Sequence, residues 1–364
     1  MKWIKPRFAV ESMEAYQAPL EGRRNLLRLD FNENTLGPSP KVIEALKQIP
    51  SSHISIYPEY NGIKEALLEN FSANRPSISI SPNQIGIFNG VDASINAIFH
   101  AYGDQKELLL TTNPTFGYYS PCADMRGMET LAIPYEGDNF AFPLNKIKVC
   151  LKEKKPRILL ICNPNNPTGT VISPQQIYAL SELSPDTLIV VDELYEAFGG
   201  ESLLPKINFD LSPNIVVLRS LSKTAGLAGL RIGFAIGNKN IINCISRVTG
   251  PYDVNTFAAV AAIASLKDQS YIDSYIEEVF SARYWLKEKL ENEKIKHHIN
   301  AGNYLLIWPK RDPKEMERCL KEDGILIRNM SNKHLIENSF RVSIGTQNQM
   351  QKFWESFIRH ESID

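Results

Sequence analysis

Short apolar runs alternate with mixed segments through the first two thirds of the chain. Most of these runs are apolar throughout and rich in β-branched residues, which is typical of strands buried on both faces of a parallel sheet. Predicted strands cover residues 84–88, 107–112, 128–134, 157–162, 187–191, 215–218 and 231–236. Because helical segments separate them, the pattern predicts an α/β fold, a three-layer sandwich around a mostly parallel sheet.

Helix signals occur between the predicted strands. Ser39 and Pro40 are typical of an N-cap and a first helical residue, for a helix through Lys47, and Ser173-Pro174 repeats this pair. Further helices are expected over 63–71, from 92 to about 101, and after 113–119. From about residue 255 a helical pattern runs to about 293, and strands follow at 304–308, 325–328 and 340–344, with a closing helix over 347–359. We therefore expect an N-terminal arm and loop over 1–40, a large domain over 41–255 and a small α+β domain over 256–364.

Composition narrows the classes of partner. The formal net charge of the 364 residues is −1, so no global field attracts nucleic acid or an anionic membrane. Basic residues are scattered, apart from a short patch over 152–157 that we interpret as a solvated loop. We expect neither nucleic acid nor membrane as a partner.

The cysteines and histidines show no metal-type spacing. The five cysteines are widely spaced and odd in number, which argues against a disulfide framework and favours a reducing compartment. No apolar segment follows the basic residues at the N-terminus, and the apolar run over 257–266 is too short to span a bilayer. These features predict a cytoplasmic protein without a metal.

Lys223 stands out as a candidate reactive amine. It follows the predicted strand over 215–218 and lies among Gly, Ala and Leu, where poor hydration disfavours the ammonium form. An amine with a lowered pKa can form a Schiff base with an aldehyde. Ser220, Ser222 and Arg231 are the groups that a phosphate needs beside that amine. Together they suggest pyridoxal phosphate (PLP), although a Ser-Lys pair in a loop is also common without any cofactor.

Two further polar residues follow predicted strands. Asp192 comes after four apolar residues, where it could face the pyridine nitrogen of PLP, cap a helix or bind Mg²⁺. Asn166 lies in Asn-Asn-Pro-Thr-Gly, where its amide could donate to the phenolate oxygen of the cofactor or simply form a turn. Since ligands bind beyond the carboxyl ends of strands in open α/β sheets, both positions favour a site.

Other candidate residues are individually weaker signals. The hydroxyl of Tyr195 could reach the same phenolate, and Phe116 could stack on the cofactor ring, but both residues could equally be packed aromatics. The N–H groups of Val91 and Asp92, at an expected helix start after Gly90, suit a phosphate. The sequence contains no G-x-S-x-G elbow, P-loop or G-x-G-x-x-G fingerprint, so hydrolase, kinase and dehydrogenase readings lack their motifs.

The order of these motifs resembles one enzyme family. Asn-Asn166-Pro-Thr-Gly, Asp192-x-x-Tyr195, Ser220-x-Ser222-Lys223 and Arg231 resemble the fold-type I PLP-dependent aminotransferases of class I/II over nearly the whole chain. Within that group the chain is most similar to histidinol-phosphate aminotransferases. The similarity extends to an arm over 14–19, a substrate loop over 29–39, a turn at 57–59 and two arginine strands over 324–328 and 340–346.

The resemblance implies roles for these residues. Lys223 would carry the cofactor and shuttle a proton, with Asp192 at the pyridine nitrogen and Tyr195 at the phenolate. The remaining cofactor contacts would come from Val91, Asp92, Phe116, Asn166, Ser220, Ser222, Arg231 and Tyr57 of a neighbouring subunit. Substrate contacts would come from Tyr16, Asn34, Arg328 and Arg341. A homodimer with shared active sites is implied, with an amine donor and a 2-oxo acid as substrates.

Three departures leave the amine substrate open. Thr35 stands where the family usually has proline, Phe116 where many members have tyrosine, and Val91 where a small polar residue is usual. The resemblance implies transamination of histidinol phosphate with 2-oxoglutarate. Threonine-phosphate decarboxylation and aromatic amino-acid transamination use the same scaffold and remain alternatives. A ligand-binding regulatory domain is the alternative from another class, but no basic stripe or helix-turn-helix precedes Asn32.

Overall fold

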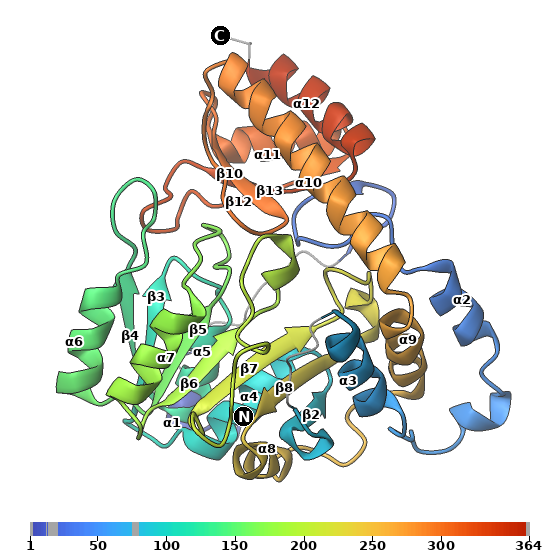
Figure 1. The fold of residues 1–364 in the computed structure, drawn as a ribbon. Coiled ribbons are helices and arrows are strands. Elements are labelled where there is room, and N and C mark those ends of the chain that lie inside the picture. The colour runs from blue at the N-terminus through green and yellow to red at the C-terminus, as the bar shows by residue number, and fades with distance from the viewer. Residues whose placement is uncertain (1–2, 12, 14–20, 75–79, 362–364) are drawn as a thin grey trace.

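The large domain is built on one seven-stranded sheet. A computed structural model describes residues 3–11, 13, 21–74 and 80–361. The sheet has the order β2-β8-β7-β6-β5-β3-β4, and β8 alone runs antiparallel to its neighbours (Figure 1). Its strands are β2 (Ile85–Phe88), β3 (Leu108–Asn113), β4 (Glu129–Pro134), β5 (Ile158–Cys162), β6 (Leu188–Asp192), β7 (Ile215–Ser220) and β8 (Gly233–Gly237). The predicted α/β architecture with a mostly parallel sheet is confirmed.

Alternate residues of the central strands pack into two different apolar clusters. In β6, for example, Ile189 and Val191 belong to one cluster, whereas Leu188 and Val190 belong to the other. This follows from the two-residue period of a strand and explains why each strand is apolar throughout. The first face is covered by α2 (Pro40–Lys47), α3 (Ile63–Asn74), α6 (Leu144–Lys154), α7 (Pro174–Leu183) and α9 (Thr256–Leu266). The second is covered by α4 (Val91–Tyr102), α5 (Tyr119–Arg126) and α8 (Lys239–Ser246).

A second, smaller unit with its own apolar core lies towards the C-terminus. Its four-stranded antiparallel sheet has the order β12-β13-β10-β9, with β9 (Lys296–His298), β10 (Tyr304–Trp308), β12 (Arg328–Asn329) and β13 (Phe340–Ser343). Three helices pack on this sheet: α10 (Gln269–Asn292), α11 (Pro313–Glu322) and α12 (Gln347–Glu361). A short parallel pair, β1 (Leu27–Arg28) with β11 (Ile325–Leu326), ties the N-terminal segment to this unit.

The boundary between the two domains remains a proposal. The helix α9 packs against α2 and α3, so its residues belong to the core of the large domain. The long helix α10 then crosses over: Ile272 contributes to the large-domain cluster, whereas Tyr275 contributes to the small-domain cluster (Figure 1). These contacts favour a boundary within α10 rather than before α9.

Local signals predicted some helix ends and missed other helices. Ser39 caps α2 by accepting from the Val42 N–H, and Ser173 forms a capping box with Gln176 at α7, as predicted. The basic patch over 152–157 is not wholly a loop, because α6 continues to Lys154. Elements that the pattern did not predict are the strands β1 and β9, the helices α1 (Phe8–Glu11), α6, α8 and α11, and the 3₁₀ turns η1 (Ser51–Ile54), η2 (Pro82–Gln84), η3 (Glu196–Phe198) and η4 (Ala228–Leu230). No helix among the described residues is long and apolar enough to cross a membrane.

Candidate active site

A cavity of about 1180 Å³ lies where the N-terminal loop and both domains meet. The loops that follow β3, β5, β6 and β7 contribute to its wall, as the strand-end rule predicts. Most of the predicted site residues line it, namely Val91, Asp92, Phe116, Asn166, Tyr195, Ser220, Ser222, Lys223, Arg231, Arg328 and Arg341. Residues far apart in the sequence are therefore brought to one place.

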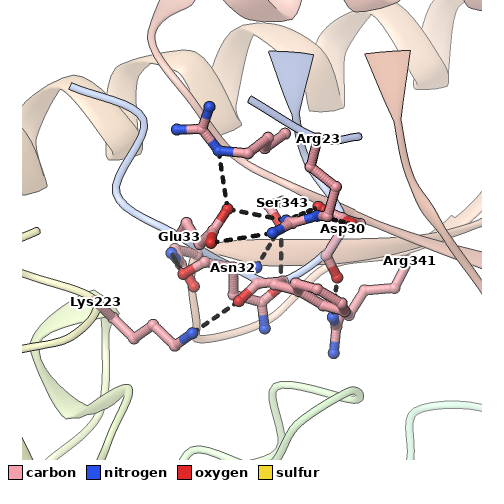
Figure 2. Close-up of polar contacts among 10 residues, drawn as sticks. Arg23, Asp30, Asn32, Glu33, Lys223, Arg341 and Ser343 are labelled. Carbon is pink, nitrogen blue, oxygen red and sulfur yellow. Dashed lines mark hydrogen bonds and ion pairs between the residues drawn. The ribbon is translucent and has the colours of Figure 1, made fainter. Parts of the chain in front are cut away.

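Lys223 points to the loop over residues 30–34. Its Nζ donates a hydrogen bond to the carbonyl oxygen of Phe31 at 2.7 Å (Figure 2). Burial lowers the pKa of the Lys223 amine to about 8, and the positive charge of Arg341 acts in the same direction. A fraction of the amine is thus unprotonated near neutral pH, as an imine-forming lysine requires.

Asp192 ends β6 and is almost fully buried. Its Oδ2 accepts from the Tyr119 hydroxyl at 2.7 Å, and its Oδ1 accepts from the Leu194 N–H at 3.1 Å. Burial raises the pKa of the Asp192 carboxyl to about 6, and the two donors oppose that shift. The carboxylate is therefore held in one orientation, suited to a cationic ring nitrogen. The contribution of Tyr119 was not predicted.

Two asparagines converge on the Tyr195 hydroxyl. Its oxygen accepts from Asn32 Nδ2 at 3.0 Å and from Asn166 Nδ2 at 3.4 Å. Arg341 lies beside them and donates to Asn166 Oδ1 and to the carbonyl oxygen of Asp30, both at 2.5 Å. Asn166 and Tyr195 were each expected to contact the cofactor rather than one another, and Asn32 was not among the predicted site residues.

A cradle for an anion lies at the start of α4. Gly90 caps the helix with φ of 81°, so the N–H groups of the first turn are not covered by a side chain. Arg231 Nη2 contacts Asp92 Oδ2 at 3.0 Å, and the Ser220 hydroxyl donates to Ser222 Oγ at 2.8 Å. A Cβ at Gly90 would lie 2.5 Å from Arg231 Nη2, so a larger residue would displace the guanidinium. Two hydroxyls, a guanidinium and free N–H groups fit the phosphate of PLP.

The outer end of the cavity is charged. Glu33 Oε2 accepts from Arg23 Nη2 at 3.0 Å and from Arg28 Nε at 3.2 Å (Figure 2). The guanidiniums of Arg23 and Arg328 lie 4.2 Å and 5.7 Å from the ring centroid of Phe31. An anion that binds here would contact guanidinium groups. The Glu33 carboxylate already neutralises part of the charge of two of them, Arg23 and Arg28. The Arg23–Glu33 pair was not predicted as part of the site.

Three of the predicted residues that the structure describes do not line the cavity, namely Asp192, whose contacts are given above, Asn34 and Tyr57. Asn34 donates to the carbonyl oxygen of Thr224 and accepts from the N–H groups of Leu36 and Gly37, so its amide holds the loop rather than facing the cavity. Tyr57 is 72% exposed and stacks on Tyr252, with ring centroids 4.0 Å apart. Tyr16 lies outside the described residues.

Several proteins similar to this chain are named as aminotransferases or transaminases. A histidinol-phosphate aminotransferase from Moorella thermoacetica is 30% identical over 96% of this chain and 89% of its own length. A dihydroxyacetone phosphate transaminase from Campylobacter jejuni is 31% identical over 90% of this chain and 88% of its own. The crystal structure of histidinol-phosphate aminotransferase from Sinorhizobium meliloti in complex with pyridoxal-5'-phosphate superimposes with a TM-score of 0.86 at 21% identity, covering 99% of this chain and 98% of that one.

The family assignment rests on most of the chain. The family described as aminotransferase class I and II matches residues 24–357, a range that includes the lysine loop, the anion cradle and both arginine strands. The residues outside the match are 1–23 and 358–364. The chain therefore belongs to the class I and II aminotransferases.

Proposed function

We propose that this enzyme transfers the amino group of a phosphorylated amine, histidinol phosphate, to 2-oxoglutarate. The observation that carries the proposal is one cavity with a reactive amine, Lys223, at its inner end and the guanidiniums of Arg341 and Arg328 on its wall. The likeness to histidinol-phosphate aminotransferases along nearly the whole chain supports the choice of amine.

The family's cofactor is PLP, and the donor set of the cavity fits it. PLP supplies an aldehyde that condenses with amines and a cationic ring that withdraws electrons. Lys223 would hold the cofactor through Nζ and, when its amine is free, would accept and return a proton. Asp192 would keep the ring nitrogen protonated, and the cradle of Ser220, Ser222 and Arg231 would hold the phosphate.

Substrate orientation falls to the arginines and the loop over 30–34. Arg341 is 94% buried and already fixed by Asn166 and the Asp30 carbonyl, so its guanidinium is presented in one direction. A phosphate monoester carries up to two charges and three acceptor oxygens, which match planar guanidinium donors well. Arg341 and Arg328 would hold that phosphate while the amino carbon lies over Lys223.

The Campylobacter relative supports a second candidate substrate. Dihydroxyacetone phosphate and the keto form of histidinol phosphate both carry a phosphate ester one carbon away from the reacting carbonyl, and neither has an α-carboxylate. The two substrates differ in the group on the other side of the carbonyl. Dihydroxyacetone phosphate has a hydroxymethyl group there, and the keto form of histidinol phosphate has an imidazolylmethyl group. The part of the cavity wall around Glu33 and Arg23 would contact this group and so distinguish the two substrates.

A panel of amine donors tests the proposal. Purified protein loaded with PLP is mixed with histidinol phosphate, serinol phosphate, threonine phosphate, phenylalanine or glutamate, and the visible absorbance of bound PLP is followed. We expect histidinol phosphate and glutamate to bleach the band and 2-oxoglutarate to restore it. Bleaching by serinol phosphate but not by histidinol phosphate would favour the second candidate, and release of CO₂ from threonine phosphate would favour a decarboxylase.

The pH dependence of cofactor capture follows from the lowered pKa of Lys223. The unprotonated amine is the nucleophile, so the rate of PLP uptake by unloaded protein should rise about tenfold per pH unit below pH 8 and level off above it. A stopped-flow record of the visible band between pH 6 and pH 10 measures this. If the rate kept rising to pH 10, Lys223 would have an ordinary pKa and the burial argument would be wrong.

We also propose a homodimer in which Tyr57 completes the partner's phosphate site. Ile54, Ile56 and Tyr57 are all exposed large side chains of one segment between α2 and α3, although isolated surfaces rarely expose such a group together. Tyr57→Ala should weaken PLP binding about tenfold, the worth of one hydrogen bond to a charged group. Mixing Tyr57→Ala with Lys223→Ala should restore tight PLP binding at one of the two sites of each mixed dimer, the site that keeps Lys223 and receives Tyr57 from its partner. A protein that sediments as a monomer at working concentration would contradict this proposal.

The thiols support a reducing, cytoplasmic setting. All five cysteines are free, and Cys122, Cys162 and Cys319 are buried. Burial raises the pKa of the Cys162 thiol and raises that of Cys122 to about 12, so neither is a reactive thiolate.

A further inference from the structure

Asn32 has a fixed side-chain orientation in the loop that covers Lys223. It is 1% exposed, and Ser343 of β13 binds it twice. The Asn32 N–H donates to Ser343 Oγ at 2.9 Å, and the Ser343 hydroxyl donates to Asn32 Oδ1 at 3.0 Å (Figure 2). Reversing this amide would leave the proton of the fully buried Ser343 hydroxyl without an acceptor among the described residues, so the Nδ2 group is the end that faces Tyr195, at 3.0 Å.

The side-chain amide of Asn166 also has a fixed orientation, which is set by a different partner. Arg341 has only donors, and its Nη1 contacts the side-chain oxygen of Asn166 at 2.5 Å. The Asn166 Nδ2 group is therefore directed at Tyr195, at 3.4 Å. Both amides present donors to one phenolic oxygen. Reversing Asn166 would set its Nδ2 group against the Arg341 donor, and reversing Asn32 would leave the Ser343 proton without an acceptor among the described residues.

The Tyr195 hydroxyl is consequently left with a proton to donate. A phenol has one proton, and its oxygen already accepts from two amides. Among the described residues no hydrogen bond runs from this hydroxyl to an acceptor, although Tyr195 lines the cavity. Burial raises the pKa of Tyr195 well above its usual range, so the proton is present throughout the working pH range.

We propose that Asn32 is a positioning residue that, together with Asn166, makes Tyr195 a hydrogen-bond donor into the cavity, toward the phenolate oxygen of bound PLP. The inference rests on the proposed function, because it takes the cofactor to occupy this cavity. Nothing in the local sequence around Asn32 signals this role, since its partners lie 163 and 311 residues away.

The backbone of Asn32 has a second effect on the same site. Its φ is 56°, a left-handed conformation that asparagine, aspartate and glycine adopt more readily than other residues. The preceding carbonyl, that of Phe31, faces Lys223 Nζ. Asn32→Asp keeps this backbone and the side-chain shape but replaces the donor with a charged acceptor, so its effect combines the turned Tyr195 proton with an added negative charge.

The pH midpoint of the visible absorbance of bound PLP reports on this donor. A donor at the phenolate oxygen stabilises the more negative, deprotonated chromophore, so losing it raises the midpoint. We expect Tyr195→Phe and Asn32→Asp each to raise the midpoint by about one to two pH units, the equivalent of a hydrogen bond to a charged group. In Asn32→Asp the Tyr195 proton turns to the new carboxylate. The double variant should shift the midpoint by less than the sum of the two single shifts, because only the effect of the added charge remains when the Tyr195 hydroxyl is absent.

Each outcome decides between the alternatives. A loaded Asn32→Asp protein with the wild-type midpoint, or shifts that add in the double variant, would overturn the inference. If Asn32→Asp fails to fold, Ser343→Ala releases the Asn32 amide without entering the cavity and should give a smaller shift of the same sign that disappears in the Tyr195→Phe background. Ser339→Ala, another buried serine close to β13 whose hydroxyl binds the Ile336 carbonyl, is the matched control and should show no shift. A wild-type protein that binds no PLP would instead refute the proposed function itself.

Discussion

Lys223→Ala should abolish the visible absorbance of bound PLP and lower the transamination rate by about four orders of magnitude. Two roles are lost together, because the same Nζ binds the aldehyde and carries the proton. The amine has no substitute nearby: the other lysines on the cavity wall, Lys314 and Lys333, lie in and after α11 with the outer residues rather than beside Asp192. Absorbance spectra and single-turnover rates measure the two losses separately.

The matched control is a lysine on the surface. Lys239, exposed at the start of α8, should be replaceable by alanine with an unchanged spectrum and rate. Added methylamine should partly restore proton transfer in Lys223→Ala but not in the control, because only the former has lost its base. A Lys223→Ala protein that keeps the wild-type band would show that another amine binds the cofactor.

The inner wall of the site could be predicted because sheet neighbours end together. The strands β5, β6 and β7 are adjacent, with Cys162, Asp192 and Leu218 in register. Residues that follow these strands must therefore meet, whatever the loops do in detail. For this reason strand ends predict that Asn166, Asp192 and Lys223 lie close together, and the resemblance to the family adds Tyr195 to them.

Contacts made across the chain could not be predicted in that way. Tyr119 begins α5 and reaches Asp192 over 73 residues, and its neighbours in sequence give no sign that its hydroxyl points to the site. In the loop over 30–34, the choice between Asn32 and Asn34 depends on one left-handed residue, which turns the Asn32 side chain to Tyr195 and leaves that of Asn34 to bind the Thr224 carbonyl. Such alternatives differ by a rotation of the backbone rather than by composition.

Asp192→Asn should lower the transamination rate by about 10² to 10³-fold while leaving the fold intact. The amide has nearly the same shape but no charge, so it cannot hold a proton on the ring nitrogen. Of the two donors that now face the carboxylate, Tyr119 and the Leu194 N–H, the amide oxygen can satisfy only one. Tyr119→Phe is a milder variant of the same site. It removes one donor to Asp192 but keeps the carboxylate charge, and it should lower the transamination rate about tenfold.

Asp192→Asn should lower the transamination rate but raise the free energy of unfolding of the protein without PLP. The pKa of Asp192 is about 6 when folded against 3.8 when unfolded, so the unfolded state loses its proton first as the pH rises. From about pH 4 to pH 6 this group lowers the free energy of unfolding, by about 3 kcal/mol in total, and the cost remains at pH 7. Asp192→Asn removes that cost and loses about 1 kcal/mol of hydrogen bonding.

Thermal unfolding of unloaded protein at pH 7 should therefore show Asp192→Asn to be more stable than wild type by about 2 kcal/mol, whereas at pH 4 the advantage should disappear. With PLP added the order should reverse, since only the wild type gains the full binding free energy of the cofactor. A carboxylate kept for structure would behave otherwise: its removal would destabilise the protein with and without PLP. The reversal is thus the mark of a charge that is buried at a cost to folding because the cofactor needs it.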